Sequence, residues 1–170
     1  IFNAAAALGI EPGMLARGFD SLMFCLSKGL GAPVGSLLAG SRSFIGEARR
    51  VRKRMGGGMR QAGILAAAGL LALVEGPSRL AEDHRRAAAL AGALQELGYQ
   101  VDPAAVKTNI VIFGTGATDA AALINRLREA DVAAAAVGPR AVRFVTHRDL
   151  DDRDLDRVIA TLRRLGKASH

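Results

Sequence analysis

Three glycines within seven residues follow a short apolar run, and they constrain the fold more than any other feature of the chain. The run 20–27 is nearly continuous in apolar character and predicts a buried strand. Lys28 follows it, and Gly29, Gly31 and Gly35 then remove most side chains from the backbone. A loop of this kind lets a bulky ligand approach the main chain closely. Lys28 is therefore either a surface residue at a strand end or a reactive amine that faces such a ligand.

Length and cysteine content limit the class of protein. The 170 residues are enough for one domain or two small ones with a real core. The single cysteine, Cys25, lies in the predicted strand, which excludes an internal disulfide and is typical of a reducing compartment. Glycines and charges interrupt every apolar run before it reaches the roughly 20 residues of a membrane span. We therefore expect a soluble cytoplasmic protein without a membrane partner.

The net charge of +7 raises the question of nucleic-acid binding. Five of six consecutive residues from Arg49 to Arg54 are basic, and such a cluster can contact phosphates. However, the chain lacks a set of aromatic side chains for base stacking, and acidic residues are interspersed elsewhere. A solvated helix face or a subunit contact explains the cluster better, so we expect no nucleic-acid partner.

Periodicity and turn residues predict two parts, 1–75 and 76–170. Gly76, Pro77 and Ser78 are turn residues that are expected to separate two helices, 62–74 and 79–97. The other elements expected in the first part are a helix closed by Gly9, a helical turn at 12–17, strands at 20–27 and 37–39, and a helix at 41–55. In the second part we expect strands at 99–101, 109–113, 133–137 and 141–146, a helix at 118–130 capped by Thr118, and a helix from Asp151 to Leu165. This order predicts a compact α+β layer sandwich.

Four segments occur in a familiar order: "DSLMFCLSKGLGAPVGSLLAGS", "RKRMGGGMRQAGILAAAGLLAL", "TNIVIF" and "VRFVTHRDL". Together they resemble the low-specificity threonine aldolases, which belong to the aspartate-aminotransferase-like (fold type I) pyridoxal-phosphate enzymes. The resemblance covers nearly all 170 residues. It implies an α/β fold in which 1–75 is the end of the large cofactor-binding domain and 76–170 is a small C-terminal α+β domain.

The resemblance also implies roles for individual residues. Lys28 matches the lysine that holds pyridoxal phosphate (PLP). Lys53 and Arg60 match basic residues near the cofactor phosphate, both expected to reach the site of a neighbouring subunit. Arg143 matches the arginine that binds the substrate α-carboxylate, for which a guanidinium has suitable bidentate geometry. His147 is expected to be structural, and no metal site is expected.

The implied activity is that of a PLP-dependent lyase that cleaves threonine or allo-threonine to glycine and an aldehyde. The implied assembly is a homotetramer, arranged as a dimer of dimers. In the family, the groups that bond the pyridine nitrogen, stack on its ring and form the phosphate loop precede the segment that starts at Ile1. We therefore expect this chain to hold the second half of the site and to be inactive alone. Two alternatives stay open: a β-eliminating amino acid lyase on the same scaffold, and a non-catalytic basic interaction module.

Overall fold

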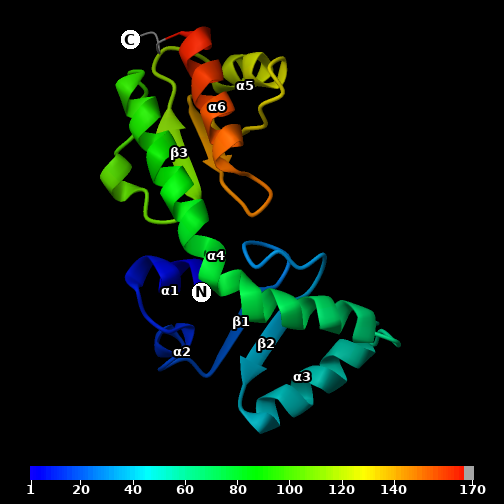
Figure 1. The fold of residues 1–170 in the computed structure, drawn as a ribbon. Helices are drawn as coiled ribbons and strands as arrows, with labels where there is room; N and C mark the ends of the chain where they lie inside the picture. The colour runs from blue at the N-terminus through cyan, green and yellow to red at the C-terminus, as the bar shows by residue number, and fades with distance from the viewer. Residues whose placement is uncertain (167–170) are drawn as a thin grey trace. The chain divides into compact units, whose positions relative to one another are not determined.

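The structure, a computed structural model, describes residues 1–166 and forms two compact units. The first unit ends at Leu80 and the second begins at Ala81. Figure 1 shows helices and strands in both units, which confirms the mixed α/β class. The junction lies inside one long helix, α4 (Gly63–Glu96). The assignment of 1–75 and 76–170 to a large and a small domain of a PLP enzyme stays a prediction.

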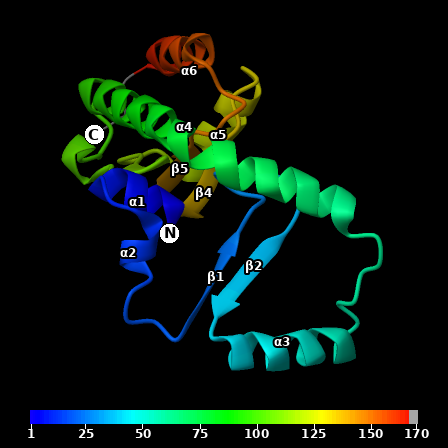
Figure 2. The same cartoon turned by 60° about the horizontal axis from the view of Figure 1, so that its bottom comes forward.

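The first unit is built around a two-stranded antiparallel hairpin, in which Ser21 pairs with Gly40 and Cys25 pairs with Ser36. In both views this hairpin stands between α3 and the first half of α4 (Figures 1 and 2). Gly9 ends the first helix with a φ of 65°, and the hydroxyl of Ser41 accepts a hydrogen bond from Phe44 N–H at 3.2 Å to cap α3. The elements are α1 (Phe2–Leu8), α2 (Pro12–Leu15), β1 (Ser21–Cys25), β2 (Ser36–Gly40) and α3 (Arg42–Arg54).

The core of the first unit is small. It consists of Leu26, Leu30, Ala32 and Ala72, with Phe2, Phe24 and Leu73 packed against them. The expectation that β1 is buried is wrong for the described structure, because Met23 is 63% exposed and every residue of β2 is exposed. A two-stranded hairpin covered by few side chains cannot bury both faces. Large apolar residues of α4 are exposed as well, including Ile64 at 83% and Val74 at 78%.

The predicted break at Gly76, Pro77 and Ser78 is wrong, because α4 continues through all three residues. Proline removes one backbone N–H and costs about 3 kcal/mol in a helix interior. Here the hydroxyl of Ser78 donates a 2.9 Å hydrogen bond to the carbonyl of Glu75. Leu80, one turn after the proline, is only 1% exposed. Burial of this side chain favours continuation of the helix and offsets the cost of the proline.

Helix α4 also corrects the expectation that no run is long enough to span a membrane. Among the described residues it is the one helix that is sufficiently long and apolar by length and composition. Only 22% of its most apolar window is buried, so most of this apolar surface is open for packing. Ala72 and Leu80 join the helix to the first unit, and Leu90 and Leu94 lie in the core of the second. These contacts favour a core helix of a folded protein.

The second unit is a three-stranded antiparallel sheet with helices on one face. The strand order is β3–β5–β4, and Ile112 of β3 pairs with Arg143 of β5, which pairs with Ala135 of β4. The remaining elements of this unit are η1 (Pro103–Ala105), β3 (Ile110–Gly114), α5 (Ala120–Arg128), β4 (Ala135–Gly138), β5 (Ala141–Val145) and α6 (Asp152–Leu165). This arrangement agrees with the predicted α+β layer.

Alternation along β3 and β5 separates the core from the outer face of this sheet. Val111, Phe113 and Phe144 are at most 5% exposed and face the helices. Phe113 stacks on Phe144 with ring centroids 5.5 Å apart and meets Tyr99 edge-on at 5.1 Å. Ile112 on the opposite face is 53% exposed. The sheet therefore has one packed face and one open apolar face.

Two local expectations for the second unit need correction. The predicted strand at 99–101 is a single bridge between Gln100 and Gly114. The N-cap of α5 is Asp119 rather than Thr118, because the Asp119 carboxylate accepts hydrogen bonds from the N–H groups of Ala121 and Ala122. The start of α6 at Asp151 is confirmed, with a reciprocal capping box formed with Asp154.

Candidate active site

Lys28 lies on a hydrogen-bonded turn just after β1. The Gly31 N–H donates to the Lys28 carbonyl at 2.9 Å, and the Ala32 N–H donates to the Leu26 carbonyl at 3.0 Å. The Lys28 side chain is exposed. Gly35 has a φ of +121°, a backbone conformation that residues other than glycine rarely adopt. The turn therefore presents the Lys28 amine to the outside from a defined backbone position.

Gly29, next to the lysine, is closely surrounded. A β-carbon on Gly29 would lie 3.1 Å from Nδ2 of Asn3 and 3.2 Å from Cδ2 of Leu80. Asn3 comes from the first helix and Leu80 from α4, so side chains distant in sequence meet at this glycine. Sequence reasoning recognised the glycine but not these two neighbours, because no motif connects them.

The glycines after α3 fold back onto its last turn. The Gly57 N–H donates to the Arg52 carbonyl at 2.8 Å. The Nζ atom of Lys53 lies 2.8 Å from the point where a β-carbon on Gly58 would be. The ammonium group is thus held against uncovered backbone at the C-terminal, electronegative end of a helix. Arg60 follows two residues later and is exposed.

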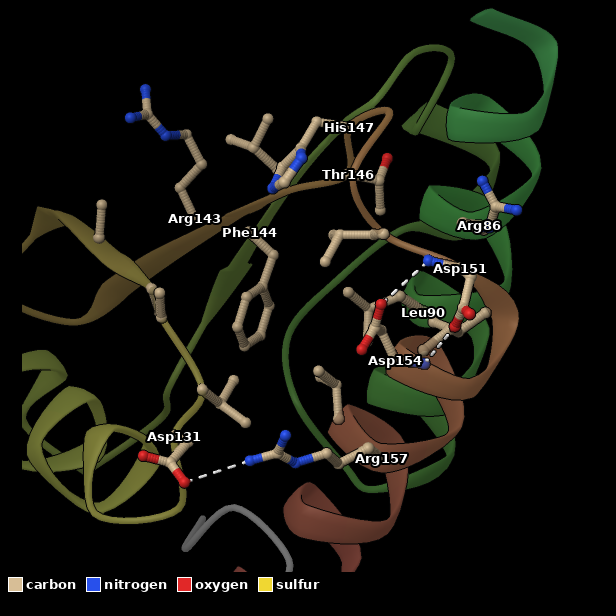
Figure 3. Close-up of a pocket in the computed structure, with 18 residues that line it drawn as sticks. Arg86, Leu90, Asp131, Arg143, Phe144, Thr146, His147, Asp151, Asp154 and Arg157 are labelled. Carbon is tan, nitrogen blue, oxygen red and sulfur yellow. Dashed lines mark hydrogen bonds and ion pairs between the residues drawn. The ribbon is translucent and has the colours of Figure 1, made fainter. Parts of the chain in front are cut away.

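Arg143 lies at the centre of β5 on the open face of the sheet, beside Ile112 and Ala135. Figure 3 shows its side chain pointing away from the direction taken by Phe144. Arg143 belongs to the second unit, whereas Lys28, Lys53 and Arg60 belong to the first.

A pocket of about 490 Å³ lies in the second unit, and sequence reasoning missed it. Its interior includes Leu90, Phe144 and Val158. Arg157 crosses to Asp131, with Nη2 of the arginine 3.3 Å from Oδ2 of the aspartate (Figure 3). Phe144 belongs to the recognised segment 142–150, whose Arg143 also lines the pocket. Leu90 and Val158 come from segments without a recognisable motif, so only the folded structure reveals that they share a pocket with it.

One buried cation of this pocket, Arg86, belongs to an ion-pair network. Its side chain is only 9% exposed, and its Nε atom donates to Oδ1 of Asp152 at 2.8 Å. This hydrogen bond raises the pKa of Arg86 against the opposing effect of burial. Hydrogen bonds from Arg85 and Arg86 lower the pKa of Asp152. His147 also lines this pocket, with its Nδ1 atom 3.6 Å from Oδ2 of Asp149, and its structural role stays a prediction.

Comparison with known proteins places the chain in a family. Residues 1–116 match the family model of the beta-eliminating lyases. The chain belongs to the beta-eliminating lyase family. The matched part contains three of the predicted site residues, namely Lys28, Lys53 and Arg60.

The chain is similar in sequence to several proteins named as threonine aldolases. The chain is 46% identical over 160 residues to the low specificity L-threonine aldolase of Escherichia coli (strain K12), covering 94% of this chain and 47% of that protein. It is 38% identical over 169 residues to the probable low-specificity L-threonine aldolase 2 of Arabidopsis thaliana, covering 97% and 48%. The chain thus spans about half the length of these curated relatives.

Solved structures establish the fold of this family member as fold type I. A putative L-allo-threonine aldolase from Listeria monocytogenes superposes with a TM-score of 0.75 at 20% identity, covering 96% of this chain and 49% of that one. A putative aromatic amino acid beta-eliminating lyase/threonine aldolase from Exiguobacterium gives a TM-score of 0.76 at 22% identity, with coverage of 96% and 49%. The predicted resemblance and fold class are confirmed.

Enzymes of this family and fold depend on PLP, and the first unit has groups that fit this cofactor. Lys28 supplies a primary amine on an exposed turn, and a primary amine is the group that bonds the aldehyde of this cofactor. Lys53 supplies a cation, and an ammonium group can pair with a phosphate. The residues present therefore agree with the chemistry of the cofactor.

Proposed function

We propose that this chain is part of a PLP-dependent aldehyde-lyase that cleaves threonine, allo-threonine and similar β-hydroxy-α-amino acids to glycine and an aldehyde. The observation that carries the proposal is the exposed Lys28 on its glycine turn, within a segment that matches the family model. The names of the relatives support this substrate class. Because the chain spans about half of their length, we propose that it works with additional chain and is inactive alone.

Each predicted residue has a distinct task in this proposal. When bound, PLP supplies a conjugated ring that takes up the charge left at the substrate α-carbon. Lys28 would hold the cofactor through its amine. Lys53 and Arg60 pair with the cofactor phosphate.

Arg143 has the task of fixing the substrate. Its guanidinium can bind both oxygens of the α-carboxylate, and its apolar neighbours Ile112 and Ala135 provide no competing charge. Fixing the carboxylate orients the Cα–Cβ bond for cleavage. As this bond breaks, the β-hydroxyl loses its proton and the Cβ side leaves as the aldehyde, while the α-carbon gains a proton to give glycine.

We further propose a cytoplasmic homotetramer, arranged as a dimer of dimers. The exposed apolar residues of the first unit, such as Met23 and Ile64, support burial by additional protein. The basic cluster on α3 would lie at a subunit contact, with Lys53 and Arg60 reaching the neighbouring site. Small amino acids are the expected ligands, without nucleic acid or membrane.

A β-eliminating amino acid lyase is the second candidate. The description of the matched family and the name of the Exiguobacterium structure both favour it. It shares the lysine and differs in the products, since elimination releases ammonia and a keto acid. A non-catalytic basic interaction module is the third candidate and would not bind PLP covalently.

The decisive experiment uses the full-length natural protein, PLP and borohydride, which makes the bond between cofactor and lysine permanent. Peptide mass spectrometry should find the added mass on Lys28, and Lys28→Ala should remove both this mass and nearly all glycine formation from threonine. Lys107→Ala, an exposed lysine of the second unit, is the matched control and should retain both. Undiminished trapping in Lys28→Ala would contradict the proposal. Ammonia and keto acid without aldehyde would support the β-eliminating lyase, and no trapping at all would support the binding module.

A further inference from the structure

Gly76 of α4 is in direct contact with the loop that carries Lys28. A β-carbon on Gly76 would lie 3.0 Å from the Leu30 carbonyl oxygen and 3.1 Å from the Leu30 α-carbon. It would also lie 3.0 Å from Cδ2 of the Leu30 side chain. Such separations are at the limit of what carbon atoms tolerate. Two of the three atoms belong to the backbone and cannot rotate away, so a side chain at position 76 must displace the loop.

A second glycine of α4 receives the other side of the same loop. A β-carbon on Gly69 would lie 2.9 Å from Cδ1 of Leu26, the end of a flexible side chain. Gly69 and Gly76 are seven residues apart, so they share one face of the helix. Leu26 precedes Lys28 by two residues and Leu30 follows it by two. The lysine is therefore held between two points at which the loop rests on α4.

A hydrogen bond within the loop couples the position of Leu30 to the backbone of Lys28. The Leu30 backbone lies inside the turn that the Gly31 N–H closes on the Lys28 carbonyl at 2.9 Å. Leu30 is only 2% exposed, so it has little space into which to move. A displacement of Leu30 is consequently transmitted to the backbone of the lysine.

Two features disfavour a side chain at position 76. Pro77 follows it inside α4, and the proline ring disfavours a helical conformation for a preceding residue that carries a β-carbon. The close approach of the Leu30 backbone is the second feature. Pro77→Ala removes the first, so Gly76→Ala in a Pro77→Ala background isolates the contact with the loop.

We propose that Gly76 is a positioning residue that sets the location of Lys28, with Gly69 providing a second and more tolerant support. The inference rests on the proposed role of Lys28 as the lysine that holds PLP. Gly76 does not touch the cofactor in this proposal. It acts through the backbone of Leu30.

The test compares Gly76→Ala with Gly92→Ala in the full-length protein. Gly92 lies in the same helix, and a β-carbon there has no heavy atom within 4 Å. Hydrogen exchange without PLP is measured at the amides of Gly31 and Ala32, which donate to the Lys28 and Leu26 carbonyls. We expect at least about tenfold faster exchange in Gly76→Ala and no acceleration in Gly92→Ala.

With PLP added, the pH midpoint of the visible absorption and the rate of borohydride trapping on Lys28 are measured. In Gly76→Ala the midpoint should shift and trapping should slow by about tenfold to a hundredfold, because small misplacements of reacting groups are costly. In Gly92→Ala the pH midpoint and the trapping rate should equal those of the wild type. If the wild type traps no PLP on Lys28, the proposed function fails; if it does and Gly76→Ala behaves like Gly92→Ala, the present inference fails.

Double variants separate backbone contact from side-chain packing. Leu26→Val removes Cδ1, so it should restore exchange and absorption in the Gly69→Ala background. Leu30→Val removes Cδ2 but leaves the backbone contacts, so it should not restore them in Gly76→Ala. Restoration by Leu30→Val would overturn the backbone assignment. If Gly76→Ala does not fold, the Gly69→Ala pair decides: a shift rescued by Leu26→Val supports the proposal, and no shift contradicts it.

Discussion

Oδ1 of Asp152 accepts hydrogen bonds from two adjacent arginines, Nε of Arg86 at 2.8 Å and Nη2 of Arg85 at 2.6 Å. This single carboxylate oxygen joins α4 to α6 at the start of the final helix. Arg86 is nearly buried and also pairs with Glu82 and Asp83, but Asp152 is its nearest partner, and water cannot fully replace this contact. The contact makes the stability of the second unit dependent on pH.

Asp152→Asn should lower the stability of the second unit near neutral pH. The pKa of Asp152 is lowered in the folded protein, so its charge stabilises the fold above the unfolded carboxyl value of about 4 and this contribution is lost as pH falls through the folded pKa. Urea unfolding should therefore show a difference between variant and wild type that is largest at neutral pH and shrinks in acid. Asp156→Asn, an exposed site on the same helix, should change little. A difference independent of pH would contradict the ion-pair explanation.

Phe113→Ala should destabilise the second unit by about 3–5 kcal/mol, the usual cost of removing a buried aromatic ring. Phe113 is 1% exposed and contacts both Tyr99 and Phe144. Its neighbour Ile112 lies on the open face, so Ile112→Ala in the isolated chain should cost about 1 kcal/mol or less. Denaturant titration at neutral pH measures the free energy of unfolding of both variants. Equal losses would mean that the open face is covered.

Arg143→Lys should weaken threonine binding in the full-length enzyme. Lysine keeps the charge but cannot bind a carboxylate in bidentate geometry, and a hydrogen bond to a charged group contributes about 1.5–3 kcal/mol. We expect KM for threonine to rise by about tenfold or more, with PLP retention unchanged. Arg140→Lys, in the turn before β5, is the control. Similar KM values for both variants would argue against the carboxylate role.

Lys53→Ala and Arg60→Ala should weaken PLP retention more than they change product ratios, because each removes a cation that is proposed to pair with the phosphate. Equilibrium dialysis should show PLP dissociation constants raised by about tenfold or more. Arg49→Ala, an exposed arginine on the same helix as Lys53, should retain wild-type binding. If the residues act across subunits, mixing Arg60→Ala with Lys28→Ala should recover activity in the hybrid oligomers. No recovery would place Arg60 in the site of its own subunit or outside the site.

Local patterns in the sequence predicted most elements, including β1 in the apolar run 20–27 and the start of α6 at Asp151. They failed where a longer-range or finer interaction decides. Pro77 ordinarily ends a helix, yet burial of Leu80 and other packing contacts keep α4 continuous. Thr118 and Asp119 are both good caps, and only side-chain geometry distinguishes them.

The candidate site was also predicted only in part. Lys28 was recognisable through the resemblance of its segment and three later ones to the threonine aldolases, because a lysine before a glycine turn is by itself a common feature. The contact between Leu30 and Gly76 was not recognisable, because the two positions are far apart in sequence and a glycine in a helix has no pattern of its own. The pocket near Arg86 likewise depends on segments that meet only in the folded chain.

The continuity of α4 has a practical consequence for recombination between homologous enzymes. A crossover placed at Gly76 and Pro77 would join halves of one helix from different parents, and the Gly76 surface would face a foreign Leu30 loop. A crossover at Gly98, where the helix has ended and φ is 83°, keeps residues 63–96 with the loop that packs against them. Chimeras spliced after this helix should therefore fold more often than those spliced at the proline.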